Sequence, residues 1–230
     1  MCTFESENGA VYAKQLDTVT ITKGTVEDIT CEASWSIINY SIGYNLNGGS
    51  ISGQKTSYNV TTDTFTLPIP TRNGYTFTGW TGTGLSSATK TVTVAKGSTG
   101  NRSYTANWNT NTYTISYNLN GGNISGQKAS YDVTTEAFTL PTPTRTGYTF
   151  TGWTGTGLSS ATKTVTVAKG STGNRSYAAS WSANGYTVSF NYNKPATDGA
   201  IGNAGTTSKA VTFDSTYGTL PAPTLNGYSF

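Results

Sequence analysis

The sequence predicts a mainly β chain, or a small α+β chain with little helix, in which tandem repeat domains follow one another as beads on a string. Two observations lead to this prediction. Thr, Ser, Gly, Asn and Tyr dominate the 230 residues, and charged residues make up only 11%, a composition that favours strands over helices. The chain also matches itself at an offset of 73 residues, so that Trp80 aligns with Trp153 and Trp108 with Trp181.

This period divides the chain into four segments. Residues 40–108 and 113–181 are full repeats that differ at 11 of 69 positions. Residues 1–35 align with the end of a repeat, and residues 186–230 align with the beginning of one after a seven-residue insertion. We therefore expect the C-terminal part of a preceding repeat, two full repeats and the N-terminal part of a truncated third, taken from a longer array. Each full repeat is near the lower size limit of an autonomous domain, and short polar connectors separate the repeats.

The first half of the repeat begins with a strand and a turn. Apolar and polar residues alternate over 113–119, which is the period of a half-buried strand. Asn-Gly-Gly at 120–122 supplies the positive φ angles that a tight hairpin turn requires, so a second strand is expected at 127–133. Two prolines within 140–147 lack the N–H group that a central strand needs, and this segment is predicted to be a connector or a short helical turn.

The second half of the repeat is expected to add three more strands, for about five in total. One strand returns at 148–153, with Tyr148 and Phe150 on one face and Trp153 on the other. The segments 164–167 and 175–181 are expected to pair as a hairpin around a Gly-containing loop.

One motif of the sequence is highly specific: Pro-Thr-Arg-X-Gly-Tyr-X-Phe-X-Gly-Trp at 70–80 and again at 143–153. Together with the opening strand, the Asn-Gly-Gly turn and a closing strand that ends in Trp, it makes residues 40–181 closely resemble the Listeria-Bacteroides repeat, also called the internalin B-type B repeat. The resemblance implies a small β-grasp-like domain that recurs in bacterial cell-surface and secreted proteins, with roles in projection, adhesion or protein contact. It implies neither catalytic residues nor an agreed ligand.

The residue types in the chain exclude several kinds of catalysis. Without His, the chain cannot form a Ser-His or Cys-His dyad or a His-containing zinc site. Asp63 is the only acid of the first full repeat, whereas a glycosidase needs two carboxyl groups and a Ca²⁺ site needs several carboxylate oxygens. The glycines at 79–84 lack the third Gly of a dinucleotide-binding loop and are interpreted as turn residues. We therefore expect no enzyme, no cofactor and no metal.

Four aromatic residues are candidate ligand contacts: Trp80, Trp153, Tyr75 and Tyr148. Such residues can form a platform on which sugars stack, but large side chains that fill the core are the favoured alternative, since a small domain without disulfides needs them for stability. Because Tyr75, Phe77 and Trp80 cannot share one face of a regular strand, Trp is expected to be the more exposed side chain.

Two covalent cross-links are compatible with the sequence. Cys2 and Cys31 could form a disulfide or remain two free thiols, because spacing alone does not fix the geometry. An intramolecular isopeptide bond needs a buried Lys beside an Asn and an acid, whereas exposed lysines are the favoured alternative. The candidates for that bond are Lys55, Lys90 and Lys96 with Asn45, Asn47 and Asp63.

The charge and hydropathy of the chain limit its partners. The net charge of +3 is spread along the repeats and falls short of a nucleic-acid footprint. No run of 18 apolar residues occurs, so we expect no membrane insertion in this sequence. We expect a monomeric, extended array outside the cell, at the surface or wall of a bacterium, that serves as a stalk, spacer or adhesion module. The alternative is weak multivalent binding of host or cell-wall glycans or proteins.

Overall fold

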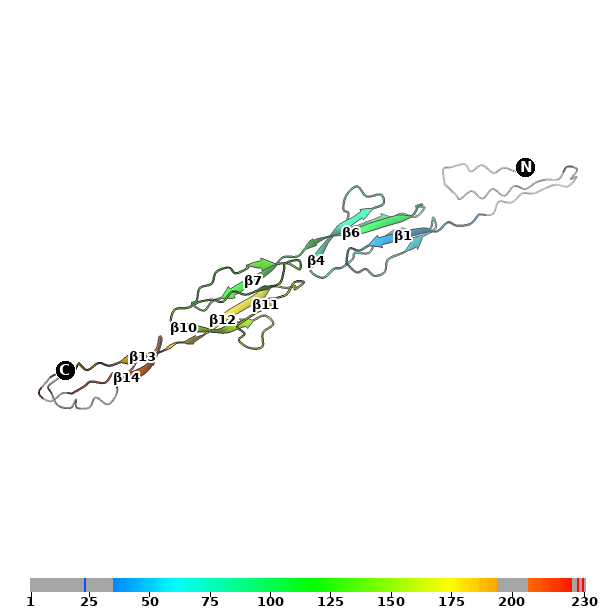
Figure 1. Ribbon diagram of the computed structural model, residues 1–230. Coiled ribbons are helices and arrows are strands. Elements are labelled where there is room, and N and C mark those ends of the chain that lie inside the picture. The colour runs from blue at the N-terminus through cyan, green and yellow to red at the C-terminus, as the bar shows by residue number, and fades with distance from the viewer. Residues whose placement is uncertain (1–22, 24–34, 194–206, 225–226, 228, 230) are drawn as a thin grey trace. The chain divides into compact units, whose positions relative to one another are not determined.

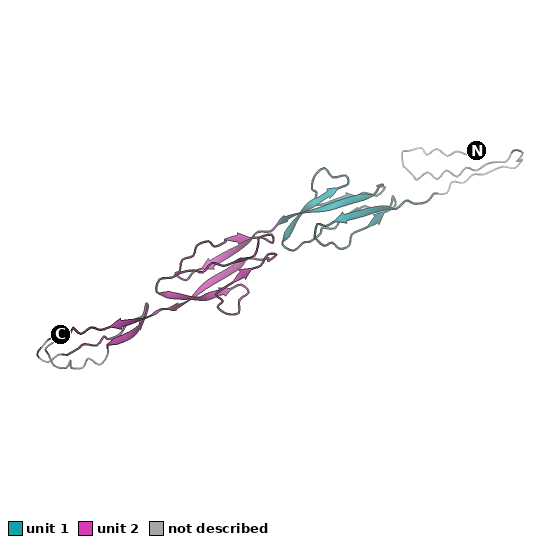
Figure 2. Cartoon of the chain, in the orientation of Figure 1, with its two compact units in different colours: residues 1–109 teal, residues 110–230 magenta. Residues whose placement is uncertain are grey.

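The computed structural model describes residues 23, 35–193, 207–224, 227 and 229 (Figure 1). All regular elements in these residues are strands, which confirms the mainly β class. The chain forms two compact units, residues 1–109 and 110–230 (Figure 2). Cys2, Cys31 and nearly all of the preceding repeat lie outside the described residues.

Each full repeat has six strands, one more than expected. The strands of the first repeat are β1 (Tyr40–Asn45), β2 (Ser57–Tyr58), β3 (Phe65–Thr66), β4 (Tyr75–Gly82), β5 (Thr93–Val94) and β6 (Arg102–Thr110). Those of the second are β7 (Tyr113–Asn118), β8 (Ser130–Tyr131), β9 (Phe138–Thr139), β10 (Tyr148–Gly155), β11 (Thr166–Val167) and β12 (Arg175–Ala183). Two further strands follow in the second unit, β13 (Gly185–Ser189) and β14 (Ser208–Thr212).

The main sheet of each repeat joins its first and last long strands at the centre. The strand orders are β2-β1-β6-β4 in the first repeat and β8-β7-β12-β10 in the second. The central pairs β1–β6 and β7–β12 are parallel, with Ile115 opposite Arg175 in the second repeat. A smaller two-stranded sheet accompanies each main sheet, β3–β5 in the first repeat and β9–β11 in the second. Parallel neighbours need a long crossover connection, and here nearly the whole repeat supplies it.

The turn after the first strand forms as the sequence predicts. Asn120 and Gly121 both have positive φ, at 48° and 84°, and the Gly122 N–H donates to the Leu119 carbonyl at 3.0 Å. These features define a primed turn of the kind that Asn-Gly favours. The second strand is present but shorter than expected, because the chain first pairs Asn123 with the connector at Thr144 and rejoins β7 only at β8.

The hairpin predicted between 164–167 and 175–181 is wrong. β11 pairs with β9, and β12 pairs with β7 on one side and β10 on the other. Because both edges of β12 are occupied by long strands, it has no edge left for β11. Val165 and Val167, 6% and 1% exposed, instead fix the segment around β11 in the core beside the small sheet.

The alternation predicted for β10 is also wrong beyond Phe150. The register shifts between Phe150 and Gly152, where a β-bulge places Phe150 and Trp153 on the same face with ring centroids 5.4 Å apart. Gly152 has φ of 148°, and a Cβ at this position would lie 2.6 Å from the Thr162 nitrogen. Glycine is therefore required here both for its backbone conformation and for the close approach of Thr162.

Each repeat encloses its own hydrophobic core. The second core is formed by Ile115, Tyr131, Leu140, Trp153, Val165, Val167, Tyr177 and Ala179, and the first core has nearly the same residue types. Trp181 closes one end of the second core, since its Nε1 donates to the Leu119 carbonyl at 3.0 Å and its ring contacts Phe150. A repeat thus buries its apolar face without a partner, unlike the short units of a solenoid.

Candidate functional site

Both tryptophans proposed as ligand contacts lie in the core. Trp80 and Trp153 are 0% exposed, so the expectation that Trp is the more exposed side chain was wrong. The physical reason is the bulge, which turns the indole ring inward against Phe77 in the first repeat and Phe150 in the second. Neither ring has a free face on which a sugar could stack.

The two tyrosines proposed as ligand contacts are half-buried and partly covered by arginine. The Arg72 Cζ lies 3.7 Å from the centroid of the Tyr75 ring, and the Arg145 Cζ lies 3.6 Å from that of Tyr148. A guanidinium stacked on a phenol ring is stabilised by the charge distribution of the ring. One face of each tyrosine is therefore occupied, and the guanidinium is the group presented above it.

Arg145 and Tyr148 line an open groove of about 550 Å³ on the second repeat, together with Lys163, Thr149 and Trp181. The ion pairs within the described residues join other groups, Lys96 to Asp63 and Lys169 to Glu136. No carboxylate of the described residues lies within ion-pair distance of Arg145 or Lys163, and Asp214, which accepts a hydrogen bond from the Tyr148 hydroxyl, is the acid beside the groove. The groove combines two cations, an aromatic edge and threonine hydroxyls, which suits an anionic or strongly polar ligand.

The corresponding region of the first repeat differs at one position. Arg72 and Lys90 replace Arg145 and Lys163 without a change of type, but Ile69 stands where the second repeat has Thr142. The Ile69 side chain is 66% exposed. The two copies thus share the cations and differ in the polarity of the rim.

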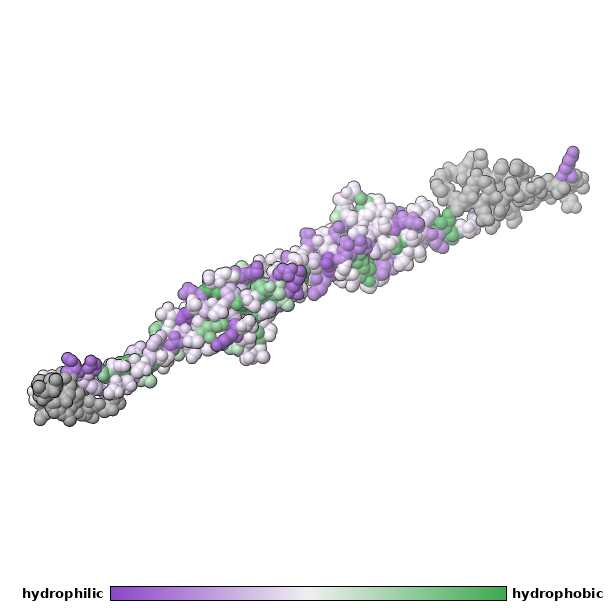
Figure 3. Space-filling view, viewed as in Figure 1, coloured by the Kyte–Doolittle hydropathy of each residue, from purple (hydrophilic) through white to green (hydrophobic). Residues whose placement is uncertain are grey.

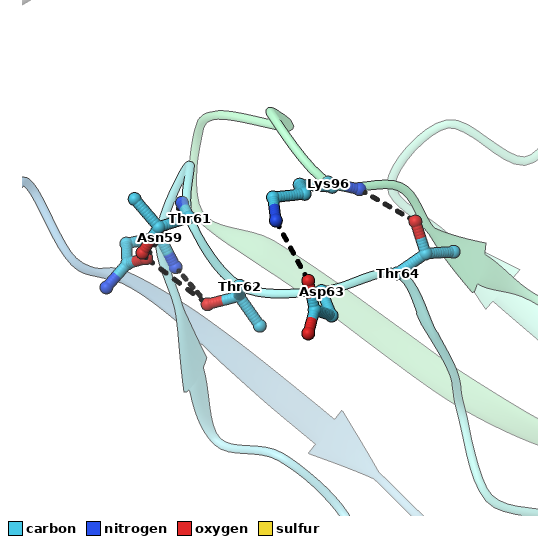
Figure 4. Close-up of polar contacts among 6 residues, drawn as sticks. All are labelled: Asn59, Thr61, Thr62, Asp63, Thr64 and Lys96. Atoms are coloured by element: carbon cyan, nitrogen blue, oxygen red, sulfur yellow. Dashed lines mark hydrogen bonds and ion pairs between the residues drawn. The ribbon is translucent and has the colours of Figure 1, made fainter.

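Lys96, one of the candidates for an isopeptide bond, forms an exposed ion pair instead. Its Nζ lies 2.9 Å from Asp63 Oδ1, and the two side chains are 60% and 91% exposed. Figure 4 shows this pair beside the turn that begins at Asn59, where Asn59 Oδ1 accepts from the backbone and hydroxyl of Thr61. Lys55 and Lys90 are exposed as well. The exposed-lysine alternative therefore applies to all three candidates.

The second repeat has Asp132 in place of Asn59 in this turn. Asp132 Oδ1 accepts from the hydroxyl and the N–H of Thr134 at 2.7 and 2.8 Å, and also from the N–H of Thr135. These hydrogen bonds, those from Thr134 first, lower the pKa of Asp132 to about 2.

In the part of the chain that the structure describes, no three His, Cys, Asp or Glu side chains gather as potential metal ligands.

A further arginine, Arg175, lies in a cluster of tyrosines that no sequence pattern predicted. Its Nε donates to the Tyr131 hydroxyl at 2.9 Å, and that hydroxyl donates to the Gly173 carbonyl at 2.6 Å. Burial disfavours the charged form of Arg175, but hydrogen bonds to Tyr177 and Tyr131 outweigh this effect and raise its pKa. This cluster links the edge strand β8 to the central strand β12 and is structural.

No helix among the described residues is long and apolar enough to span a membrane. On the face drawn in Figure 3, hydrophobic residues are interspersed with hydrophilic and intermediate ones over both units.

The fold and the site together define a tandem-repeat β protein in which each of the two full repeats has its own core. The family model of the Listeria-Bacteroides repeat domain matches residues 40–106 and 113–178. The chain belongs to this family.

Similar proteins include two from Evansella cellulosilytica, which have the provisional names membrane protein and Gly-rich membrane protein. The first is 32% identical over 216 residues, or 89% of this chain, and the second is 33% identical over 172 residues, or 73% of this chain. The matched regions cover 30% and 19% of these two proteins. No solved structure matches the chain.

Proposed function

We propose that the chain is a non-catalytic repeat segment of a bacterial cell-surface protein and acts as a stalk or spacer. The observation that supports this function best is the pair of self-contained cores, each built around a fully buried tryptophan. Repeats that fold on their own can be added in series, and each copy adds length without depending on a ligand. In this proposal the β-grasp-like module described for the family is the unit of length.

The family and the relatives support a location in the cell envelope, since both similar proteins are named as membrane proteins. The mixed polar surface in Figure 3 suits a segment that is surrounded by water. We place the segment outside the cell, at the surface or in the wall.

Small-angle X-ray scattering of the complete chain tests the stalk. We expect a monomer whose maximum dimension is well above that of a 230-residue globule, which has a radius of gyration of roughly 17 Å. Intact monomer with the dimensions of such a globule would refute the proposal. Scattering at several protein concentrations controls for association.

A second function, weak multivalent adhesion, is favoured by the groove at Arg145 and Lys163. Arg145 and Lys163, neither of which forms an ion pair among the described residues, outnumber the one acid beside the groove, Asp214, and would attract the acidic groups of a glycan or a protein. Two nearly identical copies would add avidity.

An array of acidic and neutral glycans, probed with the complete chain, tests this second function. We expect signals for acidic glycans only, reduced by Lys163→Gln and reduced further when Lys90→Gln is added. Lys128→Gln, which removes an exposed charge outside the groove, is the matched control. The glycan form of adhesion is refuted by an array without signal, or by equal losses for Lys163→Gln and Lys128→Gln.

A further inference from the structure

A single residue, Asn184, separates the last strand of the second repeat from the first strand of the next. β12 remains paired with β10 up to Ala183, which lies opposite Tyr148, and β13 begins at Gly185 opposite Thr212. The segment 182–185, expected to be a polar connector, is therefore almost entirely part of two strands. No flexible length remains between the second repeat and the β13–β14 pair.

Asn184 hydrogen-bonds to both sides of this junction. Its N–H donates to the Gly147 carbonyl at 2.9 Å, and its Oδ1 accepts from the Thr149 hydroxyl at 2.6 Å, both on the second repeat. Its carbonyl accepts from the Phe213 N–H at 2.9 Å, just beyond β14. The side chain and both backbone groups of this half-buried residue are thus engaged.

Phe213 packs directly on the second repeat. Its ring lies 5.5 Å from that of Tyr148 in an edge-to-face arrangement, and the Tyr148 hydroxyl donates to Asp214 Oδ2 at 3.1 Å. The ring also covers Gly147 so closely that a Cβ on that residue would overlap it. Gly147 has φ of 77°, so glycine suits both its backbone conformation and the contact with Phe213.

The β13–β14 pair has little to stabilise it apart from this contact. It is a two-stranded sheet whose residues are mostly exposed, with Val211 as its one buried side chain among those described. An isolated pair of strands is marginally stable at best in water. The docking of Phe213 and Asn184 on the second repeat supplies the missing contacts.

We propose that this junction is an interface that couples the folding of the β13–β14 pair to that of the second repeat. The β13–β14 pair folds only when it is docked on Gly147, Tyr148 and Thr149, and docking in turn stabilises the second repeat. The same residue types occur 73 positions earlier, at Gly74, Tyr75, Thr76 and Asn111, but Val133 stands at the position of Phe213, so the proposed coupling belongs to the junction at Asn184. This inference goes beyond the proposed function, because it holds for a stalk and for an adhesin alike.

Amide hydrogen exchange of the complete chain tests the coupling through the variant Gly147→Ala. The matched control is Gly157→Ala, because Gly157 has nearly the same φ, 74°, but no atom within 4 Å of the position of a Cβ. Both variants introduce the same backbone strain, but only Gly147→Ala places a Cβ against the Phe213 ring. We expect Gly147→Ala to lower the protection of the β13–β14 amides at least tenfold and Gly157→Ala to leave it unchanged.

A second variant, Phe213→Ala, keeps Gly147 and removes the ring. It should lower the same protection factors and shift the urea midpoint of the second repeat downward, even if Gly147→Ala prevents that repeat from folding. Adding Phe213→Ala to Gly147→Ala should cost less than the sum of the single effects, since the overlap is then relieved. Unchanged protection of β13–β14 in Phe213→Ala, or equal losses for Gly147→Ala and Gly157→Ala, would overturn the proposal.

Discussion

Trp153→Ala should remove most of the stability of the second repeat while the first repeat remains folded. Trp153 is 0% exposed, and its ring makes edge-to-face contacts with Tyr117 and Phe150 at 5.8 and 5.4 Å. Replacing a buried Trp with Ala typically costs about 3–5 kcal/mol. A domain of about 70 residues has a total free energy of unfolding of roughly 3–10 kcal/mol, at about 0.05–0.15 kcal/mol per residue. One substitution therefore removes from about a third to all of it.

The indole N–H contributes no stability to this site. Trp153 Nε1 is buried and has no hydrogen-bond partner among the described residues, so the loss on truncation comes from packing alone. Trp153→Phe keeps a ring in the core and removes the unpaired donor, and it should cost clearly less than Trp153→Ala. This variant separates the loss of ring packing from the effect of removing an unpaired buried donor.

Urea unfolding followed by two-dimensional NMR resolves the two repeats, because the 11 differences between them separate their signals. We expect Trp153→Ala to lower the midpoint of the second repeat only, and Trp80→Ala to lower that of the first. A loss below about 1 kcal/mol in the mutated repeat would refute the assignment of Trp153 as the centre of the core. An equal loss in both repeats would refute the independence of the two cores.

Three further predictions concern the second repeat. Gly122→Ala should destabilise the second repeat by about 1–3 kcal/mol by overpacking, because a Cβ would lie 2.5 Å from Trp181 Cζ2. Gly43→Ala is the control in thermal unfolding and should be almost neutral, because the atom nearest to its Cβ is 3.9 Å away. Ionised Asp132 contributes stability above its unfolded pKa of about 3.8, and this stability is lost as the pH falls through about 2. Asp132→Asn should therefore flatten the dependence of the free energy of unfolding on pH between pH 4 and 2. An unchanged pH dependence would contradict the hydrogen-bonded turn. Arg175→Met should lower the free energy of unfolding by about 1–3 kcal/mol in urea, since it removes charged donors to Tyr131 and Tyr177, and a neutral result would exclude a structural role.

The local pattern of the sequence predicted the elements that depend on neighbouring residues. The alternation at 113–119 predicted β7, and Asn-Gly-Gly predicted its turn. The two prolines predicted the connector at 140–147, which contains no strand. In each case the deciding property, side-chain period or permitted φ, belongs to the segment itself.

The features that sequence reasoning missed depend on contacts between distant residues. The bulge at Gly152 exists because the backbone of Thr162 approaches it, and nothing in residues 148–153 alone indicates this approach. Likewise, β11 fails to pair with β12 because β7 and β10 already occupy both edges of that strand. The groove at Arg145 was missed because the turn that brings Arg145 over the Tyr148 ring is not visible in the sequence motif. The available signal was the spacing of three residues between Arg145 and Tyr148.

The parallel pairing at the centre of each sheet determines the order in which the chain can fold. β7 and β10 flank β12 without pairing with each other, so the sheet of the second repeat has no centre until Arg175 and its successors have been synthesised. Over the four residues that pair with the first strand, β6 and β12 differ only at Thr105 and Ala178. The sequence therefore hardly distinguishes β12, the correct partner of β7, from β6, the equivalent strand of the preceding repeat. Synthesis from the N-terminus does so, because β6 can pair with β1 before β7 has emerged.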